Sequence, residues 1–336
     1  MLCSRLGDAG TIAGWPEVCC INGEMWRWPS AVPACGPPCS LLDLERGSFM
    51  LKAWFWVVLA IAAVLLFFVL VAAAPAPSPS LQTAAASSLD PQSSGATIWY
   101  LGHCGYAVKT RGHFLVFDYQ QTYDGRQRKS LPLQRSLAGG WINPDEIKNL
   151  QVRVFVSHSH EDHYDPVILT WKKIIPDIHY YFGWKADDDP STNYLIGPRA
   201  ELSSGGLTIA TINSHHSGVP EVAWLVKVDG LVIYHNGDCL PDNPASEHDF
   251  LKTKSARIDL AFVFPVTNPG EKYTIQEEDF FRKFSVGAAF PMHATAGDAM
   301  YLDFQKVFQD KFPGLRIHVP TKLGQKFVYE DGRIAN

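Results

Sequence analysis

The chain has 336 residues, of which 46% are hydrophobic and 19% are charged, so it can build one large domain or two smaller ones. Its formal net charge is −5, with 29 Lys and Arg against 34 Asp and Glu, and this balance argues against a nucleic-acid-binding protein, which would carry a basic excess. Seven cysteines are too few for a disulfide scaffold at this length.

The first segment, residues 1–49, is predicted to be a disordered leader or an over-extended start ahead of Met50. It holds most of the cysteines and many prolines, and its apolar residues show no sustained periodicity. A zinc site is disfavoured here because the segment has no histidine and its cysteine spacings fit no zinc finger.

Residues 50–74 contain the most apolar stretch of the chain. Ala53–Ala74 carries no charged or polar side chain, and as a helix it would span roughly 33 Å, the thickness of a bilayer core. It predicts either a transmembrane anchor or a signal peptide that starts at Met50. Lys52 precedes this run and no Lys or Arg follows before Lys109, so the later domain is expected outside the cytoplasm, membrane-anchored or secreted.

Residues 75–96 form a linker rich in Pro, Ala and Ser that cannot bury enough surface to fold. From residue 97 to residue 336 the pattern changes to short apolar runs typical of strands, interspersed with helices. Strands are expected at Thr97–Leu101, Tyr106–Lys109, Phe114–Asp118, Val152–Val156, Ile178–Phe182, Leu207–Ile212, Ala223–Val228, Leu231–His235, Ile258–Phe264 and Ala288–Phe290.

Helices are expected at Pro166–Ile174, Ile275–Phe284 and Ala299–Phe308. Asp229-Gly230 predicts a hairpin turn, and a last hairpin is expected to pair Arg316–His318 with Lys326–Tyr329. Strand-rich halves with helices between them predict two sheets that are covered by helices on their outer faces.

One motif stands out: His158-Ser159-His160-Glu161-Asp162-His163, directly after a buried-type strand and before a capped helix. His158 and His160, two residues apart in an extended segment, can bind one cation. Asp162 and His163, on the following turn, can reach a second cation. Imidazole and carboxylate ligands suit Zn²⁺, with Mn²⁺ and Fe as alternatives.

This motif resembles that of the metallo-β-lactamase-fold hydrolases, whose other landmarks occur here in family order. An early strand ends at Asp118, His215 and His216 follow a later strand, Gly237-Asp238 follows another, and a late strand ends at His293. The opening Leu101-Gly102-His103-Cys104-Gly105-Tyr106 is similar to that of the L-ascorbate-6-phosphate lactonase-like and N-acyl-phosphatidylethanolamine phospholipase D-like branch. The resemblance implies an α+β four-layer αββα sandwich, preceded by the N-terminal transmembrane or signal segment.

The resemblance further implies a site for two metal ions. His158, His160 and His215 would hold one ion, Asp162, His163 and His293 the other, and Asp238 would bridge them. His215 is preferred to His216 because the related branches place this ligand two residues before a serine. Asp118 is expected to orient a ligand histidine rather than to bind metal. For His103, a local hydrogen-bonded turn role is at least as well supported as a place near the site.

The function implied is that of a metal-dependent hydrolase. A hydroxide bridging two divalent ions, Zn²⁺ or else Mn²⁺ or Fe, would cleave an ester, lactone, amide or phosphodiester, with Asp162 and Asp238 as the catalytic residues. The expected partners are a small-molecule or lipid-like substrate and, through residues 53–74, the membrane; no nucleic acid is expected. The alternative is a membrane-tethered, non-catalytic metal- or ligand-binding protein of the same fold, against which the complete ligand set argues.

Overall fold

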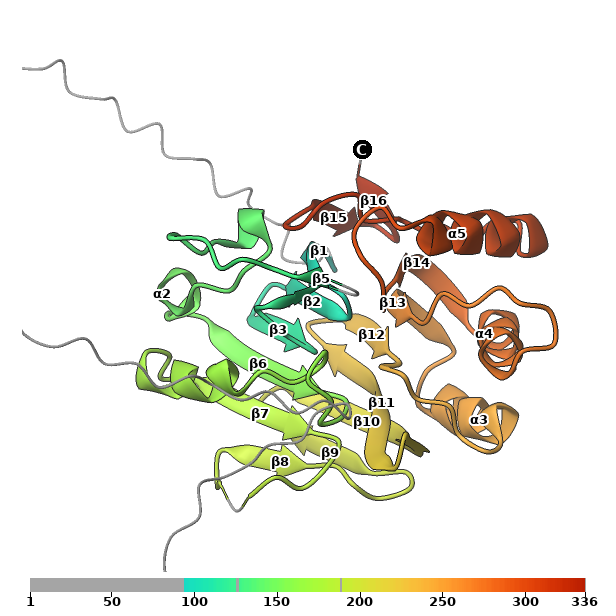
Figure 1. The fold of residues 1–336 in the computed structure, drawn as a ribbon. Coiled ribbons are helices and arrows are strands. Elements are labelled where there is room, and N and C mark those ends of the chain that lie inside the picture. Colours follow the sequence, from blue (N-terminus) through green and yellow to red (C-terminus); the bar gives the residue numbers. More distant parts are fainter. Residues whose placement is uncertain (1–93, 125–126, 188, 336) are drawn as a thin grey trace, which may run out of the picture. The chain divides into compact units, whose positions relative to one another are not determined.

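The computed structural model describes residues 94–124, 127–187 and 189–335, which fold around two mixed sheets (Figure 1). The first sheet has the strand order β16-β15-β1-β2-β3-β6-β7-β8. Its strands are β1 (Ala96–Gly102), β2 (Gly105–Lys109), β3 (His113–Phe117), β6 (Gln151–Val156), β7 (Ile178–Phe182), β8 (Thr192–Tyr194), β15 (Lys326–Glu330) and β16 (Arg333–Ala335).

The second sheet has the order β14-β13-β12-β11-β10-β9. Its strands are β9 (Glu201–Ser204), β10 (Leu207–His216), β11 (Val219–Val228), β12 (Leu231–His235), β13 (Arg257–Val263) and β14 (Ser285–Pro291). Two short strands, β4 (Tyr123–Asp124) and β5 (Gln127–Arg128), pair with each other apart from both sheets.

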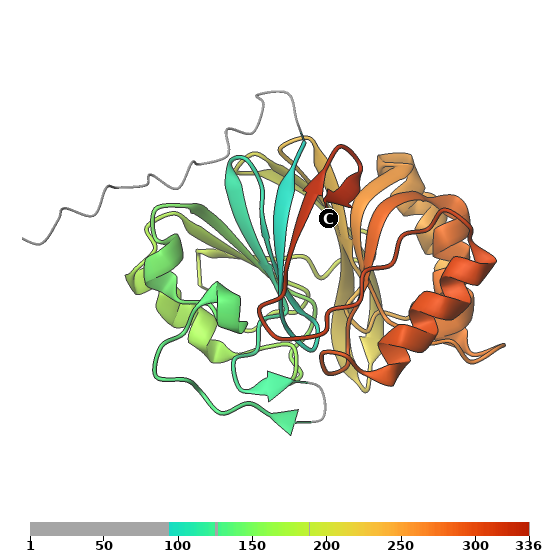
Figure 2. The same ribbon diagram turned by 90° about the horizontal axis from the view of Figure 1, so that it is seen from above.

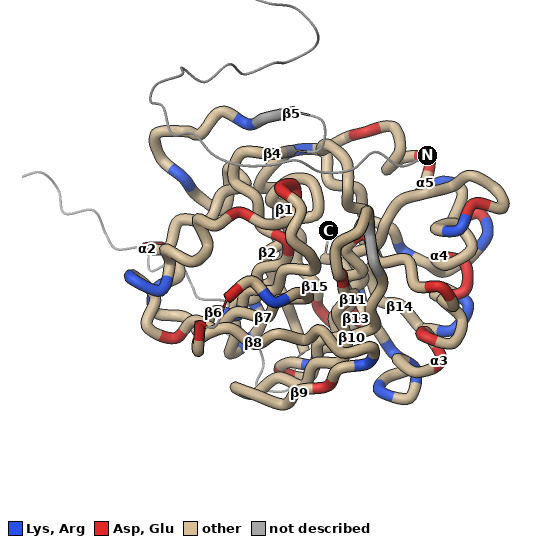
Figure 3. The backbone as a smooth tube through the Cα atoms, turned by 60° about the horizontal axis from the view of Figure 1, so that its bottom comes forward, with Lys and Arg blue, Asp and Glu red and all other residues tan. Residues whose placement is uncertain are grey.

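Helices cover the outer face of each sheet, and Figure 2 shows the resulting order of layers. Next to the first sheet lie a short helix and two 3₁₀ helices, α2 (Pro144–Ile147), η1 (Leu137–Gly139) and η2 (Pro166–Lys173). Next to the second sheet lie α3 (Pro244–Lys254), α4 (Lys272–Lys283) and α5 (Ala299–Lys311). These last three helices carry both acidic and basic residues (Figure 3), in keeping with the modest net charge.

The main core fills the space between the two sheets and is rich in aromatic side chains. Phe155 of the first sheet meets Trp224 of the second with 5.4 Å between ring centroids, and Tyr106 meets Phe262 at 4.3 Å. Separate apolar clusters join each sheet to its own helices. The predicted αββα sandwich is thereby confirmed, with its described core residues all between Ala96 and Ile334.

Each strand expected from its apolar run is present, and its ends differ from the expected ones by a few residues at most. Asp229-Gly230 joins β11 to β12 as an antiparallel hairpin, as expected. The last expected hairpin is wrong. β15 pairs with β1 and β16, while Ile317 makes only an isolated parallel bridge with Ala289. The segment around Arg316–His318 is short, and the edge of β1 offers a longer antiparallel partner.

The N-terminal segments fall outside the described residues. They comprise the leader (residues 1–49), the apolar segment (residues 50–74) and nearly all of the linker (residues 75–96). Within the described ranges, no helix is both long and apolar enough to cross a bilayer.

The topology brings four strand ends to one edge of the sandwich. β3 and β6 are parallel neighbours, and so are β12, β13 and β14. Because parallel strands end at the same edge, the residues that follow β3, β6, β12 and β14 meet there. Those residues include Asp118, the motif beginning at His158, Asp238 and His293.

Candidate metal centre

Asp118 and Ser157 form the buried base of the site. Asp118 Oδ1 accepts from Ser157 N at 2.7 Å, and Oδ2 accepts from Ser157 Oγ at 2.7 Å and from His163 Nδ1 at 2.8 Å. Burial acts to raise the pKa of Asp118, but the neighbouring His235 and His163 and the hydrogen bonds outweigh it and hold that pKa below its usual range. The carboxylate therefore stays charged and fixes the ring of His163.

His163 presents its other nitrogen to Asp238. Because Nδ1 donates to a carboxylate, the neutral form of the ring has its lone pair on Nε2. That Nε2 is buried without a hydrogen-bond partner and lies 3.4 Å from Asp238 Oδ1. Two acceptors that face each other this closely repel unless a positive charge lies between them.

The same demand for positive charge shows in the ionisation of His163. Burial acts to lower the pKa of His163, but the acidic groups around it, Asp238 and Asp118 among them, outweigh it and raise that pKa well above its usual range. A proton on His163 Nε2 would join the two atoms by donating to Asp238 Oδ1, whereas a divalent cation could accept an electron pair from each of them and from further ligand atoms nearby. The donor set at this point fits a metal ion.

Asp238 joins histidines from both sheets. Its Oδ2 lies 2.9 Å from His293 Nε2, on the opposite side from His163. Its backbone N–H donates to the buried carboxylate of Glu221 at 2.6 Å, which fixes the turn after β12. Asp238 therefore has an imidazole nitrogen near each of its two carboxylate oxygens.

The other two histidines of the motif lie beside this group. His158 Nε2 and His160 Nδ1 are 2.9 Å apart, and the ring centroids of His158 and His163 are 4.0 Å apart. His158 Nδ1 lies 3.0 Å from Ser157 Oγ and 3.1 Å from Glu221 Oε1. Burial lowers the pKa of His158 to about 3, so its ring is neutral near pH 7, the form that binds metals.

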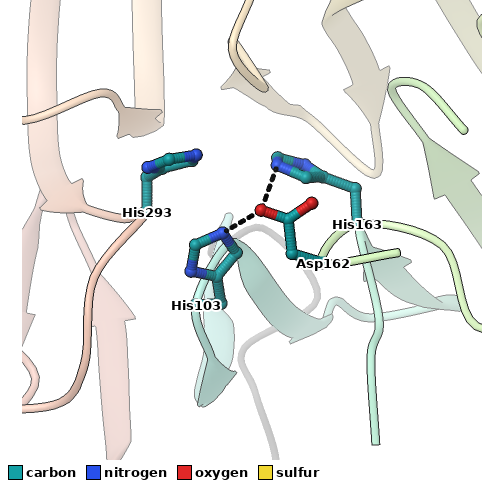
Figure 4. Close-up of side chains that lie close together, drawn as sticks. All are labelled: His103, Asp162, His163 and His293. Carbon is teal, nitrogen blue, oxygen red and sulfur yellow. Dashed lines mark hydrogen bonds and ion pairs between the residues drawn. The ribbon is translucent and has the colours of Figure 1, made fainter. Parts of the chain in front are cut away.

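The structure also brings His103 into the group, where its sequence context had equally favoured a purely local role. Ligand atoms of His103, Asp162, His163 and His293 all lie within 4.8 Å of one another (Figure 4). His103 Nε2 lies 3.1 Å from Asp162 Oδ2. Burial lowers the pKa of His103 to about 4, so the neutral ring must donate its Nε2–H to the carboxylate.

Of the residues predicted as ligands, the structure thus gathers His158, His160, Asp162, His163, Asp238 and His293 at one edge. The side chains of His215 and His216 lie outside the described part of the structure, although their backbone continues β10 to its end opposite Pro220 and Val219. The choice between these two histidines stays a prediction.

Sequence reasoning missed Glu221, which is fully buried in β11. It receives the Asp238 N–H and lies near His158, and burial, reinforced by repulsion from Asp238, raises its pKa well above the usual range. A single Glu in a strand next to a hairpin normally indicates a solvent-facing position, so the sequence offered no signal for it.

Known proteins can now be compared with this fold and site. Residues 97–285, more than half of the chain, match the family model described as a beta-lactamase superfamily domain. The chain belongs to the beta-lactamase superfamily. The family resemblance drawn from the motif is confirmed at this level, while the narrower likeness to the lactonase-like and phospholipase D-like branch stays a prediction. No curated protein matches the chain by sequence.

Solved structures of the same fold are similar at low identity. A metallo hydrolase from the hyperthermophilic archaeon Ignicoccus hospitalis is 19% identical, with 70% of this chain and 98% of that chain covered and a TM-score of 0.47. The isothiocyanate hydrolase from Delia radicum gut bacteria is 11% identical, with 68% and 97% covered and a TM-score of 0.45.

A third similar structure is CmlA, a diiron beta-hydroxylase from Streptomyces venezuelae, at 12% identity and a TM-score of 0.46. The match covers 69% of this chain and 53% of CmlA. These neighbours are named as a metallo hydrolase, an isothiocyanate hydrolase and a diiron beta-hydroxylase, and at this identity they do not define the reaction of this chain.

Proposed function

We propose that this domain is a metal-dependent hydrolase that binds two divalent cations, Zn²⁺ in the first instance. His158, His160 and His215 bind one ion, Asp162, His163 and His293 bind the other, and Asp238 contacts both. The observation that carries the proposal is the group of imidazole and carboxylate ligand atoms at one edge of the sandwich, where Asp238 Oδ1 lies 3.4 Å from His163 Nε2 and Oδ2 lies 2.9 Å from His293 Nε2. Imidazole nitrogens and carboxylate oxygens held this close together form a donor set that suits a divalent cation.

Two such ions would supply a hydroxide nucleophile near neutral pH and polarise the carbonyl or phosphoryl oxygen under attack. The chain's own residues orient the proposed ligands and exchange protons. Asp118 accepts a hydrogen bond from His163 Nδ1, and Glu221 accepts one from the backbone N–H of Asp238. Asp162, whose side chain is 24% exposed, is the group placed to take a proton from the nucleophile.

The reaction proposed is hydrolysis of an ester, lactone, amide or phosphodiester in a small-molecule or lipid-like substrate. The test is elemental analysis of the protein purified without chelator, followed by a panel of these four substrate classes. We expect close to two equivalents of Zn, Mn or Fe and turnover of at least one class that chelator abolishes. Folded protein without metal would refute the proposal, and two bound metals with no turnover would favour the non-catalytic binding protein.

We further propose that Ala53–Ala74 holds this domain at a membrane, or is cleaved on export, so that the domain acts outside the cytoplasm. The support is the uncharged run with Lys52 before it and no basic residue until Lys109. Protease added to intact cells should degrade an anchored domain. Protection until the cells are lysed would place the domain on the cytoplasmic side.

A further inference from the structure

His103 occupies the tight connection between β1 and β2, in the first sheet. Its backbone φ is +50°, a left-handed conformation that costs free energy for a residue other than glycine. Gly102 before it also has a positive φ of +100°, and Gly105 closes the turn where a Cβ would approach Gly102 O to 3.0 Å. This strained backbone conformation directs the His103 side chain toward the candidate metal centre.

His103 contacts two of the proposed ligands, which come from different sheets. Its Nε2–H donates to Asp162 Oδ2 at 3.1 Å, in the loop after β6. Its backbone carbonyl accepts from His293 N at 3.2 Å, and the rings of His103 and His293 have centroids 4.4 Å apart. An isolated bridge from His103 to Ala294 continues this contact between the sheets.

We propose that His103 is a positioning residue that fixes the Asp162 carboxylate and the backbone of His293 so that both face the second metal ion. This inference rests on the proposed two-metal function and names a residue that the ligand set leaves out. Asp162 is on a turn and is the more exposed member of the pair, with 24% of its side chain accessible against 4% for His103. Without the Nε2–H bond, its carboxylate would lose the side-chain hydrogen bond that orients it.

The hydrogen bond also argues against His103 as a metal ligand through Nε2. A ring nitrogen that carries a proton has no lone pair to give to a cation, and Nε2 must carry the proton because an ionised carboxylate only accepts. Hydrogen-bond partners that orient a ligand typically change metal affinity by about 10–100-fold when they are lost. We expect an effect of that size here.

The experiment compares His103→Leu, His103→Gln and His113→Leu in the full chain. Glutamine keeps an N–H donor at the reach of Nε2, whereas leucine keeps only bulk. His113 is the matched control, because its Nδ1 also lies 3.1 Å from a carboxylate, that of Asp229, and it is similarly buried, but in a different part of the fold. The measurements are chelator competition for each metal equivalent, thermal unfolding, and kcat and KM for any substrate found.

In His103→Leu we expect the second metal equivalent to bind about 10–100-fold more weakly, with lower kcat and little change in KM. His103→Gln should recover most of the metal affinity and most of the kcat. His113→Leu should bind both metals as the unmodified protein does. Unchanged metal affinity in His103→Leu would overturn the proposal. Equal loss in the Gln and Leu variants would also overturn it, because a ligand or a purely structural ring would then be required. An unmodified protein without metal would instead refute the proposed function itself.

Discussion

His163 donates its Nδ1–H to Asp118 Oδ2 at 2.8 Å, and both side chains are completely buried. Asp118 directly follows β3, and His163 lies on the turn after the parallel neighbour β6, where its N–H donates to His160 O. Asp118 has a φ of +41°, and His293 likewise has a φ of +69°. With His103, three non-glycine residues of the site adopt the left-handed region, a strain that persists only where the surrounding structure enforces it.

We predict that Asp118→Asn weakens metal binding about 10–100-fold. Asp118 accepts from three donors, namely Ser157 N, Ser157 Oγ and His163 Nδ1. An amide can accept on one atom only, so at least one buried donor loses its partner and the His163 ring loses its fixed orientation. Chelator competition measures the change.

Asp259→Asn is the control for the loss of a buried carboxylate. Asp259 also accepts from three groups, Val232 N, Arg257 and Tyr329 Oη, but it lies in β13 of the second sheet. That variant should lose stability and keep its metal affinity. Similar metal loss in both variants would mean that Asp118 affects metal binding only through the stability of the fold.

The sequence predicted the sandwich well because both sheets are built from short apolar runs. Strands such as β7 and β12 are buried along most of their length, so their Ile, Val, Tyr and Phe residues mark them without any partner in view. The candidate metal ligands were equally visible, because histidines and aspartates clustered at strand ends are not needed for packing. Local composition carries both signals.

The sequence predicted neither helix α3 nor the position of Glu221. Helix α3 was missed because only His248 and Leu251 of its residues are buried, too few to produce a helical apolar period. Its start is instead set by the Asn243 cap, which accepts from Ser246 N. Glu221 was missed for a different reason. Its role comes from contacts with Asp238 and His158, which lie far from it in the sequence or follow other strands.

We predict that His215→Ala removes one metal equivalent and lowers hydrolysis by orders of magnitude, because the nucleophile needs both ions. His216→Ala should keep two metals and change mainly KM. Elemental analysis and kinetics of the two variants separate them. Metal loss only in His216→Ala would show that the other histidine is the ligand, and mild effects in both would remove this landmark from the site.

We predict that Gly237→Ala destabilises the fold and disturbs the metal centre. Gly237 precedes Asp238 with a φ of +53°, and a Cβ there would lie 2.7 Å from both Cβ and Oγ of Ser157. The left-handed backbone alone costs roughly 1–2 kcal/mol, and the clash adds to it because Ser157 is held by Asp118. Chemical denaturation measures the total.

Gly270→Ala isolates the backbone cost in the same experiment. Gly270 has a φ of +79°, and nothing lies within 4 Å of its added Cβ. This variant should lose roughly 1–2 kcal/mol and keep both metals. If Gly237→Ala were no more destabilised than Gly270→Ala, the close approach to Ser157 would cost no free energy of folding.

The last prediction concerns pH and the buried Glu277 of α4. Burial raises the pKa of Glu277 to about 8, against the opposing hydrogen bonds from Gln276 and Asn236, whose Nδ2 donates to Glu277 Oε1 at 2.7 Å. Between about pH 4.5 and pH 8 the folded state therefore holds a proton that the unfolded state releases. Stability attributable to this group is full below pH 4.5 and falls as pH rises, by on the order of 1 kcal/mol per pH unit at most.

Glu277→Gln should remove that slope, because the amide keeps an acceptor for Asn236 and cannot ionise. The measurement is the free energy of unfolding from pH 5 to pH 8 at equal metal content, compared between the unmodified protein and the variant. Glu278→Gln, the next residue of α4 and an ion-pair partner of Arg282, is the control and should leave the slope in place. Parallel curves for the unmodified protein and Glu277→Gln would show that Glu277 ionises alike in the folded and unfolded states, because a carboxyl contributes to the slope only when folding changes its proton binding.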